Sequence, residues 1–410
     1  MPRFSIVMPT RNRAQLLQFA LQSALDQPTA DLEIVVSDND SKDDTPAVAQ
    51  RFRDPRVRYV RTPETLAMPD SWEFALSHAT GDYVTFLCDD DAFSPRLLSA
   101  VDAVIRAHDV EVVCWSRQTY VHPSWYVPEQ RNILQYTRTT GRVTIFDSRA
   151  ALKALCVDMS VRQGSLGPLM LNSMLSRRVV ETARARMGRF FLPPSPDYST
   201  YMAVLALVDR YAYLDDAVML SGSGRESIGS SSAYKPNTET AKEFEKEFKG
   251  KEVITRTPLK AMVPTNGVAE SILEVKRAMP DRLADIEPDW FRYYSACYAE
   301  MIHYAQIGSD MSADFAEFER VLAKQPADLQ RRVRAATRFV RPIKTFGRLA
   351  RRLIYWRQPL LSQAVGFALW RARRWLPSVP LRGEKEGFTN ILEASRSLDA
   401  VVARYDPRPG

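Results

Sequence analysis

The sequence has few cysteines and histidines, four of each in 410 residues. The cysteines are widely spaced and form no CxxC pair, so they predict neither a structural zinc site nor a disulfide framework. The histidines also lack metal-ligand spacing. No stretch reaches the roughly 18–20 uninterrupted apolar residues that a membrane-spanning helix needs, and the first residues lack the apolar block of a secretory signal. We therefore expect a soluble, cytoplasmic protein.

The composition is that of a folded protein, with 45% apolar and 26% charged residues. This excludes low-complexity disorder for most of the chain, and the length allows two or three domains. The net charge of +7 is unevenly distributed, because residues 331–374 contain 13 basic and no acidic side chains. The sequence thus joins an acidic-leaning globular part to a basic C-terminal segment.

Strand-like and helix-like periods alternate over the first 115 residues. Short apolar runs predict strands at 4–8, 32–36, 57–60, 83–88 and 110–115, and amphipathic stretches predict helices at 11–27, 71–79 and 96–107. This alternation predicts an α/β fold with a Rossmann-like, mostly parallel sheet flanked by helices. We divide the chain into a domain at 1–230 with halves at 1–115 and 116–230, a mostly helical segment at 231–330 and a basic helical region at 331–410.

Three consecutive acids, Asp89, Asp90 and Asp91, follow the predicted strand 83–88. They therefore lie at the carboxyl end of a buried strand, where open α/β sheets place ligands. Adjacent carboxylates repel one another, and a divalent cation would neutralise them. Hard oxygen ligands of this kind select Mg²⁺ or Mn²⁺. The alternative is a solvated acidic turn before a helix, which the helix dipole would favour.

Polar residues also follow two other predicted strands at the same edge. Asp38 could accept hydrogen bonds from a nucleobase or a ribose, although in isolation its position favours an Asx turn before a capped helix. Pro9, Thr10 and Arg11 end the first strand and open a helix, whose free N–H groups and basic side chains suit a nucleotide diphosphate. The alternative there is a solvated basic turn.

The segments SIVMPTRNR, EIVVSDNDSKDDT and ATGDYVTFLCDDD resemble the successive signatures of inverting family 2 glycosyltransferases with the GT-A fold. The resemblance is close over residues 3–115 and looser to about 230. It implies that Pro9, Thr10 and Arg11 line the nucleotide and that Asp38 contacts the base. It also implies that Asp89–Asp91 form the DxD element, which binds the metal and the donor diphosphate. Asp89 and Asp91 fit the literal spacing, while Asp90 is the alternative principal ligand.

The resemblance also implies a general base before a later helix, and Asp197 occupies that place. The Glu that usually precedes the base is absent, because Pro196 stands there, and a plain helix N-cap is the alternative interpretation. Arg225, in a Ser/Gly-rich loop, could close over the diphosphate or could be an exposed loop arginine. A QxxRW element, typical of processive synthases, is missing.

These observations predict inverting transfer of a single sugar from a nucleoside-diphosphate sugar, with UDP favoured, to a hydroxyl of a glycan or lipid-linked acceptor. Cell-surface polysaccharide, glycolipid or glycan assembly is the expected context. An alternative is a catalytically inactive relative that only binds sugar nucleotides. Nucleic-acid binding through the basic region is a further alternative, but no RNA- or DNA-binding signature supports it, and we expect no nucleic-acid partner.

Apolar residues recur at helical spacing through the basic region, and its arginines fall mostly off that stripe. A basic amphipathic helix of this kind can lie on an anionic membrane surface. This predicts a peripheral association with the cytoplasmic face of a membrane. The alternative is a C-terminal helix that packs on the catalytic domain with its arginines in water.

Overall fold

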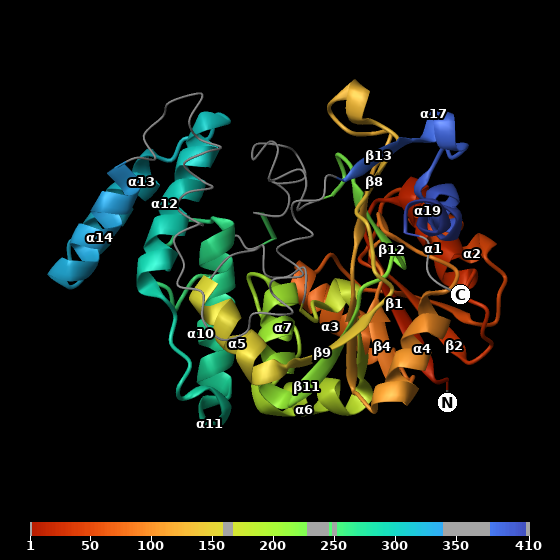
Figure 1. Cartoon of the computed structure of the whole chain (residues 1–410), viewed down its shortest axis with the longest axis horizontal. Helices are drawn as coiled ribbons and strands as arrows, with labels where there is room; N and C mark the ends of the chain where they lie inside the picture. The colour runs from red at the N-terminus through yellow and green to blue at the C-terminus, as the bar shows by residue number, and fades with distance from the viewer. Residues whose placement is uncertain (1, 159–166, 228–245, 248–251, 339–377, 407–410) are drawn as a thin grey trace.

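The computed structural model of the chain describes residues 2–158, 167–227, 246–247, 252–338 and 378–406. Two sheets with their helices form one part of the molecule, and a layer of helices covers one side of it (Figure 1). Among the described residues, no helix is long and apolar enough to cross a membrane. Most of the predicted basic amphipathic segment, residues 339–377, lies outside the described residues.

The larger sheet has eight strands in the order β3-β2-β1-β4-β10-β6-β11-β9. In chain order they are β1 (Phe4–Thr10), β2 (Leu32–Asp38), β3 (Val57–Arg61), β4 (Tyr83–Phe86), β6 (Val112–Trp115), β9 (Val143–Asp147), β10 (Ser173–Ser176) and β11 (Arg210–Leu214). Strands β1 to β4 are mutually parallel, and β11 is parallel to β6, whereas β10 and β9 run antiparallel to their neighbours. The predicted α/β class with a mostly parallel sheet is therefore confirmed.

Alternating side chains of the buried strands serve two hydrophobic cores, one on each face of the sheet. In β1, Ile6 and Met8 face one core and Val7 faces the other, as the two-residue period of a strand requires. One face is covered by α1 (Ala14–Leu25), α2 (Thr45–Arg51) and α4 (Leu97–His108). The opposite face is covered by α3 (Met68–Ser77), α5 (Ser148–Asp158), α6 (Arg177–Met187) and α7 (Pro196–Leu207).

A second core-forming layer of helices packs against α7. It consists of α10 (Pro264–Ala278), α11 (Pro280–Leu283), α12 (Trp290–Gln306), α13 (Ser312–Leu322) and α14 (Ala327–Thr337). Their apolar side chains belong to the same core as α3 and α7, so this segment is continuous with the sheet domain. A buried carboxylate, Glu270 of α10, accepts backbone hydrogen bonds from residues 255–257 and fixes the chain that leads into α10.

The smaller sheet brings distant parts of the sequence together, in the order β13-β8-β7-β12-β5. Its strands are β5 (Ala92–Phe93), β7 (Gln118–Val121), β8 (Ile133–Tyr136), β12 (Met219–Ser223) and β13 (Val379–Arg382). After β13 come α17 (Gly383–Glu386), α18 (Ile391–Arg396) and α19 (Leu398–Tyr405), which pack on this sheet. Residues 378–406, which we expected to continue the basic helical region, thus contribute an edge strand and three short helices to the sheet domain.

Candidate active site

The candidate site lies where β1 and β4 separate at their carboxyl ends. The two strands pair only from Phe4–Tyr83 to Val7–Phe86, whereas β1 continues beside β2 as far as Thr10. Pro9 lies in this unpaired part of β1, where its lack of an N–H on the β4 side costs no hydrogen bond. The chain leads from β1 to β2 on one side of β1, whereas β4 pairs with β1 on the other side. Open α/β sheets bind ligands in the crevice at the carboxyl ends of strands where the strand order reverses in this way.

Asp89 is the acid that ties β4 back to β1. One carboxylate oxygen accepts a hydrogen bond from Thr10 Oγ1 at 2.7 Å, and the other lies 2.8 Å from Arg13 Nη1. Burial alone would lower the pKa of Arg13, but the charges of Asp89 and Asp90 outweigh it and raise that pKa. The Asp89 carboxylate, 3% exposed, is therefore committed to partners within the protein.

The side chains of Cys88, Asp90 and Asp91 face one another. Their sulfur and carboxylate oxygens lie within 4.8 Å of each other. Among the described residues, none other than Asp90 itself donates a hydrogen bond to the Asp90 carboxylate, and this residue is only 7% exposed. Burial raises the pKa of Asp90 and, still more strongly, that of Asp91, and neighbouring acids add to both shifts. The Asp90 carboxylate can therefore bind a cation without first losing a hydrogen bond from another described residue.

Strand β12 lies close to the acidic turn formed by Asp89–Asp91. This close approach is possible because Gly222 has no side chain. The backbone N–H of Gly222 donates to Asp91 Oδ1 at 2.8 Å. A Cβ atom at Gly222 would lie only 1.8 Å from the Asp90 carbonyl oxygen and 2.4 Å from His122 Nε2. His122 Nε2 is itself 2.9 Å from that carbonyl oxygen. The second sheet therefore fixes the backbone of the acidic turn from one side.

Asp38 lies at the same edge, one strand further away, and is fully buried. Its oxygens accept hydrogen bonds from the Ser41 N–H at 2.8 Å and from the Tyr59 hydroxyl at 2.7 Å. Burial, followed by the nearby Asp38 carboxylate, raises the pKa of Tyr59 to about 12, so this hydroxyl remains a donor. Asp38 thus anchors the turn at residues 39–41, in which the more accessible acid is Asp40.

Two arginines just after β1, Arg11 and Arg13, contact the segment after β12 and a short stretch further on, and Arg225 lies within that segment. Arg11 forms an ion pair with Glu247 at 2.7 Å, and Arg13 Nη2 donates to the carbonyl oxygen of Glu226. Arg225 is exposed and its guanidinium lies 5.3 Å from the centre of the Tyr126 ring. Arg11 and Arg13 are therefore tied to later parts of the chain, whereas Arg225 lies in the loop after β12.

Asp197 lies in the first turn of α7, as expected for a residue just before a helix. Its carboxylate does not cap the helix from the N-cap position, because that position belongs to Ser195. Burial raises the pKa of Asp197, opposed by a hydrogen bond from the Tyr198 N–H at 3.0 Å and by the charge of Arg117. A carboxylate with a raised pKa is suited to accept a proton near neutral pH.

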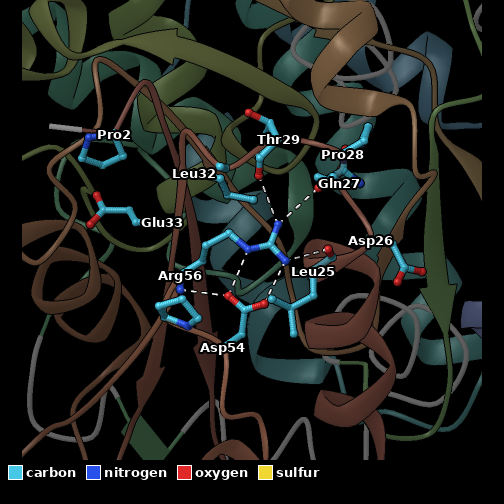
Figure 2. A pocket seen from close by; sticks show the side chains of 12 residues that line it. Pro2, Leu25, Asp26, Gln27, Pro28, Thr29, Leu32, Glu33, Asp54 and Arg56 are labelled. Atoms are coloured by element: carbon cyan, nitrogen blue, oxygen red, sulfur yellow. Dashed lines mark hydrogen bonds and ion pairs between the residues drawn. The ribbon is translucent and has the colours of Figure 1, made fainter.

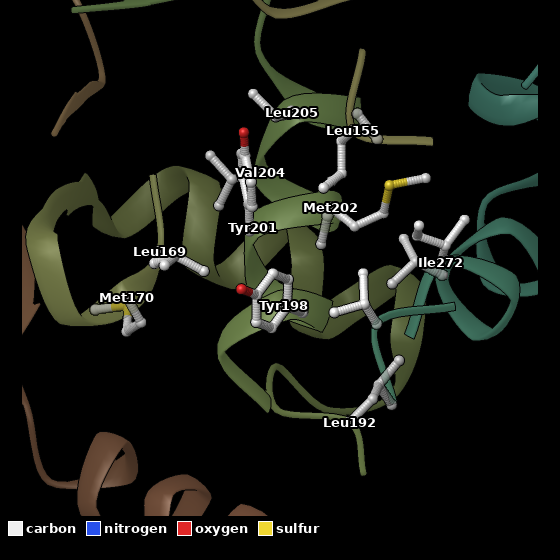
Figure 3. Packing of buried hydrophobic residues seen from close by; sticks show 14 of the residues in the cluster. Leu155, Leu169, Met170, Leu192, Tyr198, Tyr201, Met202, Val204, Leu205 and Ile272 are labelled. Atoms are coloured by element: carbon white, nitrogen blue, oxygen red, sulfur yellow. The ribbon is translucent and has the colours of Figure 1, made fainter. Parts of the chain in front are cut away.

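The turn before Asp197 is held by the helical layer. Ser271 of α10 donates to the carbonyl oxygen of Ser195 at 3.3 Å, and a Cβ at Gly267 would lie 2.7 Å from Ser195 Oγ. Figure 3 shows Met202 of α7 and Ile272 of α10 in the packed cluster behind this turn. Residues 264–278 thereby fix the position of Asp197.

The sequence did not lead us to Arg117, whose charge acts on both Asp91 and Asp197. It lowers the pKa values of Asp91 and Asp197, which burial raises, so it lies within electrostatic reach of both acids. Arg117 directly follows Ser116 at the end of β6. The rule that singled out Asp38 and Asp89, a polar residue at the carboxyl end of a strand, would also have found it.

An open cavity of about 780 Å³ lies at the opposite end of the same strands. Its lining includes Pro2, Leu32 and Glu33, at or beside the amino ends of β1 and β2 (Figure 2). Arg56 lines this cavity, and its guanidinium donates hydrogen bonds to the Asp54 carboxylate and to backbone carbonyl oxygens. Seven-residue strands separate this cavity from the acids by roughly 20 Å, so it is not part of the candidate site.

The fold and the acidic turn define a doubly wound α/β protein whose candidate site lies at the carboxyl ends of its parallel strands. Residues 5–157 match the family described as glycosyl transferase family 2. This part of the chain is therefore similar to that family, and the mostly parallel sheet agrees with the α/β class that the resemblance predicts.

Two curated relatives illustrate the similarity. The GalNAc(5)-diNAcBac-PP-undecaprenol beta-1,3-glucosyltransferase of Campylobacter jejuni is 39% identical over 104 residues, which are 25% of this chain and 34% of the relative. The UDP-Glc:alpha-D-GlcNAc-diphosphoundecaprenol beta-1,3-glucosyltransferase WfgD of Escherichia coli is 31% identical over 87 residues, which are 21% and 34%. The chain therefore matches about a third of the length of these relatives.

Among solved structures, residues 1–349 of TarS from S. aureus in complex with UDP-GlcNAc align with a TM-score of 0.47 at 17% sequence identity. That alignment covers 85% of this chain and 88% of the TarS chain.

Proposed function

We propose that the chain is a metal-dependent, inverting glycosyltransferase that moves one sugar from a nucleoside-diphosphate sugar to an acceptor hydroxyl. The observation that carries the proposal is the pair of buried, poorly partnered acids, Asp90 and Asp91, at the crevice between β1 and β4. Asp197 supports the proposal as a separate carboxylate whose pKa is raised. The charge of Arg117 acts on both Asp197 and Asp91, so the two acids lie near the same guanidinium group.

We propose Asp90 and Asp91 as the ligands of a Mg²⁺ or Mn²⁺ ion, because both have oxygens without a full set of protein donors. Asp89 is proposed to act beside them by holding Thr10 and Arg13 in place. A bound cation would stabilise the negative charge that develops on the departing diphosphate. Thr10 and Arg11 are proposed to line that diphosphate, and its binding would displace Glu247 from Arg11.

The remaining roles follow from position. Pro9 is proposed to shape the crevice floor, and the nucleoside is proposed to lie over the turn that Asp38 anchors. Arg225 is proposed to approach the diphosphate from the loop after β12. Asp197 accepts the proton of the acceptor hydroxyl while that oxygen bonds to C1 of the sugar and the C1–oxygen bond to the diphosphate breaks. Attack from the face opposite the leaving group inverts the configuration at C1.

The substitution Asp197→Asn tests this assignment. It removes the proton acceptor and keeps the shape of the side chain, so we expect transfer to fall by about 10²- to 10⁴-fold. Asp209→Asn, an exposed acid just beyond α7, is the matched control and should retain the activity. Binding of UDP with Mn²⁺, followed as a thermal shift, should survive in both variants. Full transfer by Asp197→Asn would contradict the assignment of the base.

The pH profile provides a second test of Asp197. Because burial raises its pKa, the carboxylate takes up a proton at a higher pH than an ordinary aspartate would. On acidification, kcat/KM should therefore fall along a limb whose midpoint lies above about pH 4, the usual range of Asp. Such a limb should be missing from the residual activity of Asp197→Asn.

The two named relatives support a lipid-linked acceptor and, through the WfgD name, a UDP carrier. We propose that the reaction belongs to polysaccharide or glycolipid assembly at the cytoplasmic face of a membrane. Sedimentation with liposomes tests the predicted role of the basic segment at 331–374. More protein should pellet with anionic than with neutral vesicles, and equal recovery in the supernatant would dismiss the idea.

A further inference from the structure

We infer that Cys88 supplies a sulfur ligand to the cation site of Asp90 and Asp91, so that this site binds thiophilic divalent cations more tightly than Mg²⁺. The inference rests on the proposed function, because it concerns the same cation site, but it can fail separately. It adds a sulfur donor to the three aspartates that the sequence pattern indicates.

The placement of Cys88 differs from that of the other cysteines. Cys114, Cys156 and Cys297 are each at most 1% exposed and pack in the large core. Cys88 is only partly buried and follows β4 at the point where β1 and β4 separate. Its sulfur lies within 4.8 Å of ligand oxygens of both Asp90 and Asp91. The thiol therefore faces the acids and does not serve as a core side chain.

The sulfur of Cys88 is the third possible donor of this group. Asp89 is adjacent in sequence, but its two oxygens are taken by Thr10 and Arg13. The Asp90 carboxylate belongs to a residue that is 93% buried, accepts no hydrogen bond from another described residue and lies in this group. Two donor atoms at 2.0–2.3 Å from a tetrahedral ion lie roughly 3.5 Å apart, so the three donors, which lie within 4.8 Å of one another, would have to close by roughly 1 Å when an ion binds.

The chemistry of the three donors sets the expected selectivity. A cation that binds displaces the proton of the Cys88 thiol to the solvent, and a metal–sulfur bond forms without any change of oxidation state. Thiolate ligands favour soft or borderline cations such as Zn²⁺ and Cd²⁺, whereas carboxylates alone suit Mg²⁺ and Mn²⁺. A mixed site of one sulfur and two carboxylates should therefore discriminate against Mg²⁺ and retain Mn²⁺.

Titration of the chelator-treated full chain with CdCl₂ tests the inference, because a sulfur–cadmium bond gives an ultraviolet charge-transfer band. We expect the band in the unaltered protein and in Cys297→Ala, whose cysteine is distant in the core. Cys88→Ser should lose the band and bind Cd²⁺ about tenfold more weakly, a difference of about 1.4 kcal/mol. Binding of Mn²⁺, measured by competition, should change by less than about threefold in the same variant, because the carboxylates remain.

Cys88→Asp is a second variant that keeps three donors and makes them all oxygen. It should bind Mg²⁺ and Mn²⁺ and lose the preference for Cd²⁺, which also shows that the turn still folds. A band that persists in Cys88→Ser, or Cd²⁺ binding by the unaltered protein without a band, would overturn the inference. Sugar transfer with Mn²⁺ in the absence of any band would leave the proposed function intact, whereas a band without transfer would contradict that function alone.

Discussion

Two kinds of buried acid lie at the same edge of the sheet. Asp38 and Asp89 have partners for both carboxylate oxygens, from backbone, hydroxyl and guanidinium donors. Asp90 and Asp91 are equally buried, but Asp91 accepts one backbone hydrogen bond and Asp90 accepts none from another described residue. The pKa values of the second pair are raised by burial, followed by charges that include neighbouring acids.

This difference separates acids that hold the fold from acids that are available to a ligand. A paired carboxylate stabilises the folded chain, whereas a buried carboxylate without donors destabilises it until a cation binds. Substitution by the isosteric asparagine should therefore have opposite effects on the two kinds of acid.

The largest effect is expected for Asp89→Asn. The substitution removes the charge that faces Arg13 and weakens the bond to Thr10, so the free energy of unfolding should fall by about 3 kcal/mol. Denaturant unfolding without metal measures it. Asp44→Asn, which alters an exposed acid whose side chain makes no capping hydrogen bond at the start of α2, should cause a much smaller change. Equal stability of Asp89→Asn and the unaltered chain would remove the distinction between the two kinds of acid.

An intermediate effect is expected for Tyr59→Phe. The variant keeps the ring and removes the hydroxyl that donates to the buried Asp38 carboxylate. We expect a loss of about 1–2 kcal/mol in the free energy of unfolding, because one oxygen of a buried acid loses its donor. Tyr83→Phe serves as the comparison, since that tyrosine is partly buried and its hydroxyl does not contact a site acid. Unchanged stability in Tyr59→Phe would show that Asp38 does not depend on this donor.

The smallest effect, of opposite sign, is expected for Asp90→Asn. Because burial favours the neutral form of this side chain, the amide should raise the free energy of unfolding by about 1 kcal/mol in the absence of metal. The same variant should lose the stabilisation that Mn²⁺ with UDP gives to the unaltered chain, which thermal shift measures. Destabilisation by Asp90→Asn without metal would place Asp90 among the paired acids.

Much of the first 115 residues could be predicted from the sequence, because the period of the apolar residues there is local. The strands around Ile6 and Val35 and the helix around Leu21 lie where the pattern places them. Asp38 and Asp89–Asp91 could be found for the same reason, since they lie at the carboxyl ends of strands, whereas Asp197 came from the resemblance to the family. Which acid faces which partner could not be predicted, because Asp91 depends on Gly222, which lies 131 positions further along the chain.

Two other features have no local signal. Strand β13 pairs with β8 across more than 240 residues, and only the folded chain reveals that Leu381 and Leu134 are neighbours. The packing of α10 behind Asp197 is equally remote in sequence, so the pattern identified the acid but not the helix that positions it. Long-range packing of this kind overrides what a local window of sequence can indicate.

The pairing of β13 with β8 has a practical consequence for work with this protein. The last thirty or so residues cover Tyr120, Leu134 and Tyr136 of the small sheet, and Arg396 and Asp399 bridge them to Asp26 and Arg96. A version of the chain that stops before residue 378 would leave β8 as a bare edge beside uncovered aromatic side chains, which invites aggregation. Deleting only the stretch 339–377, with a linker that joins the two flanks, is therefore the safer route to a shortened enzyme.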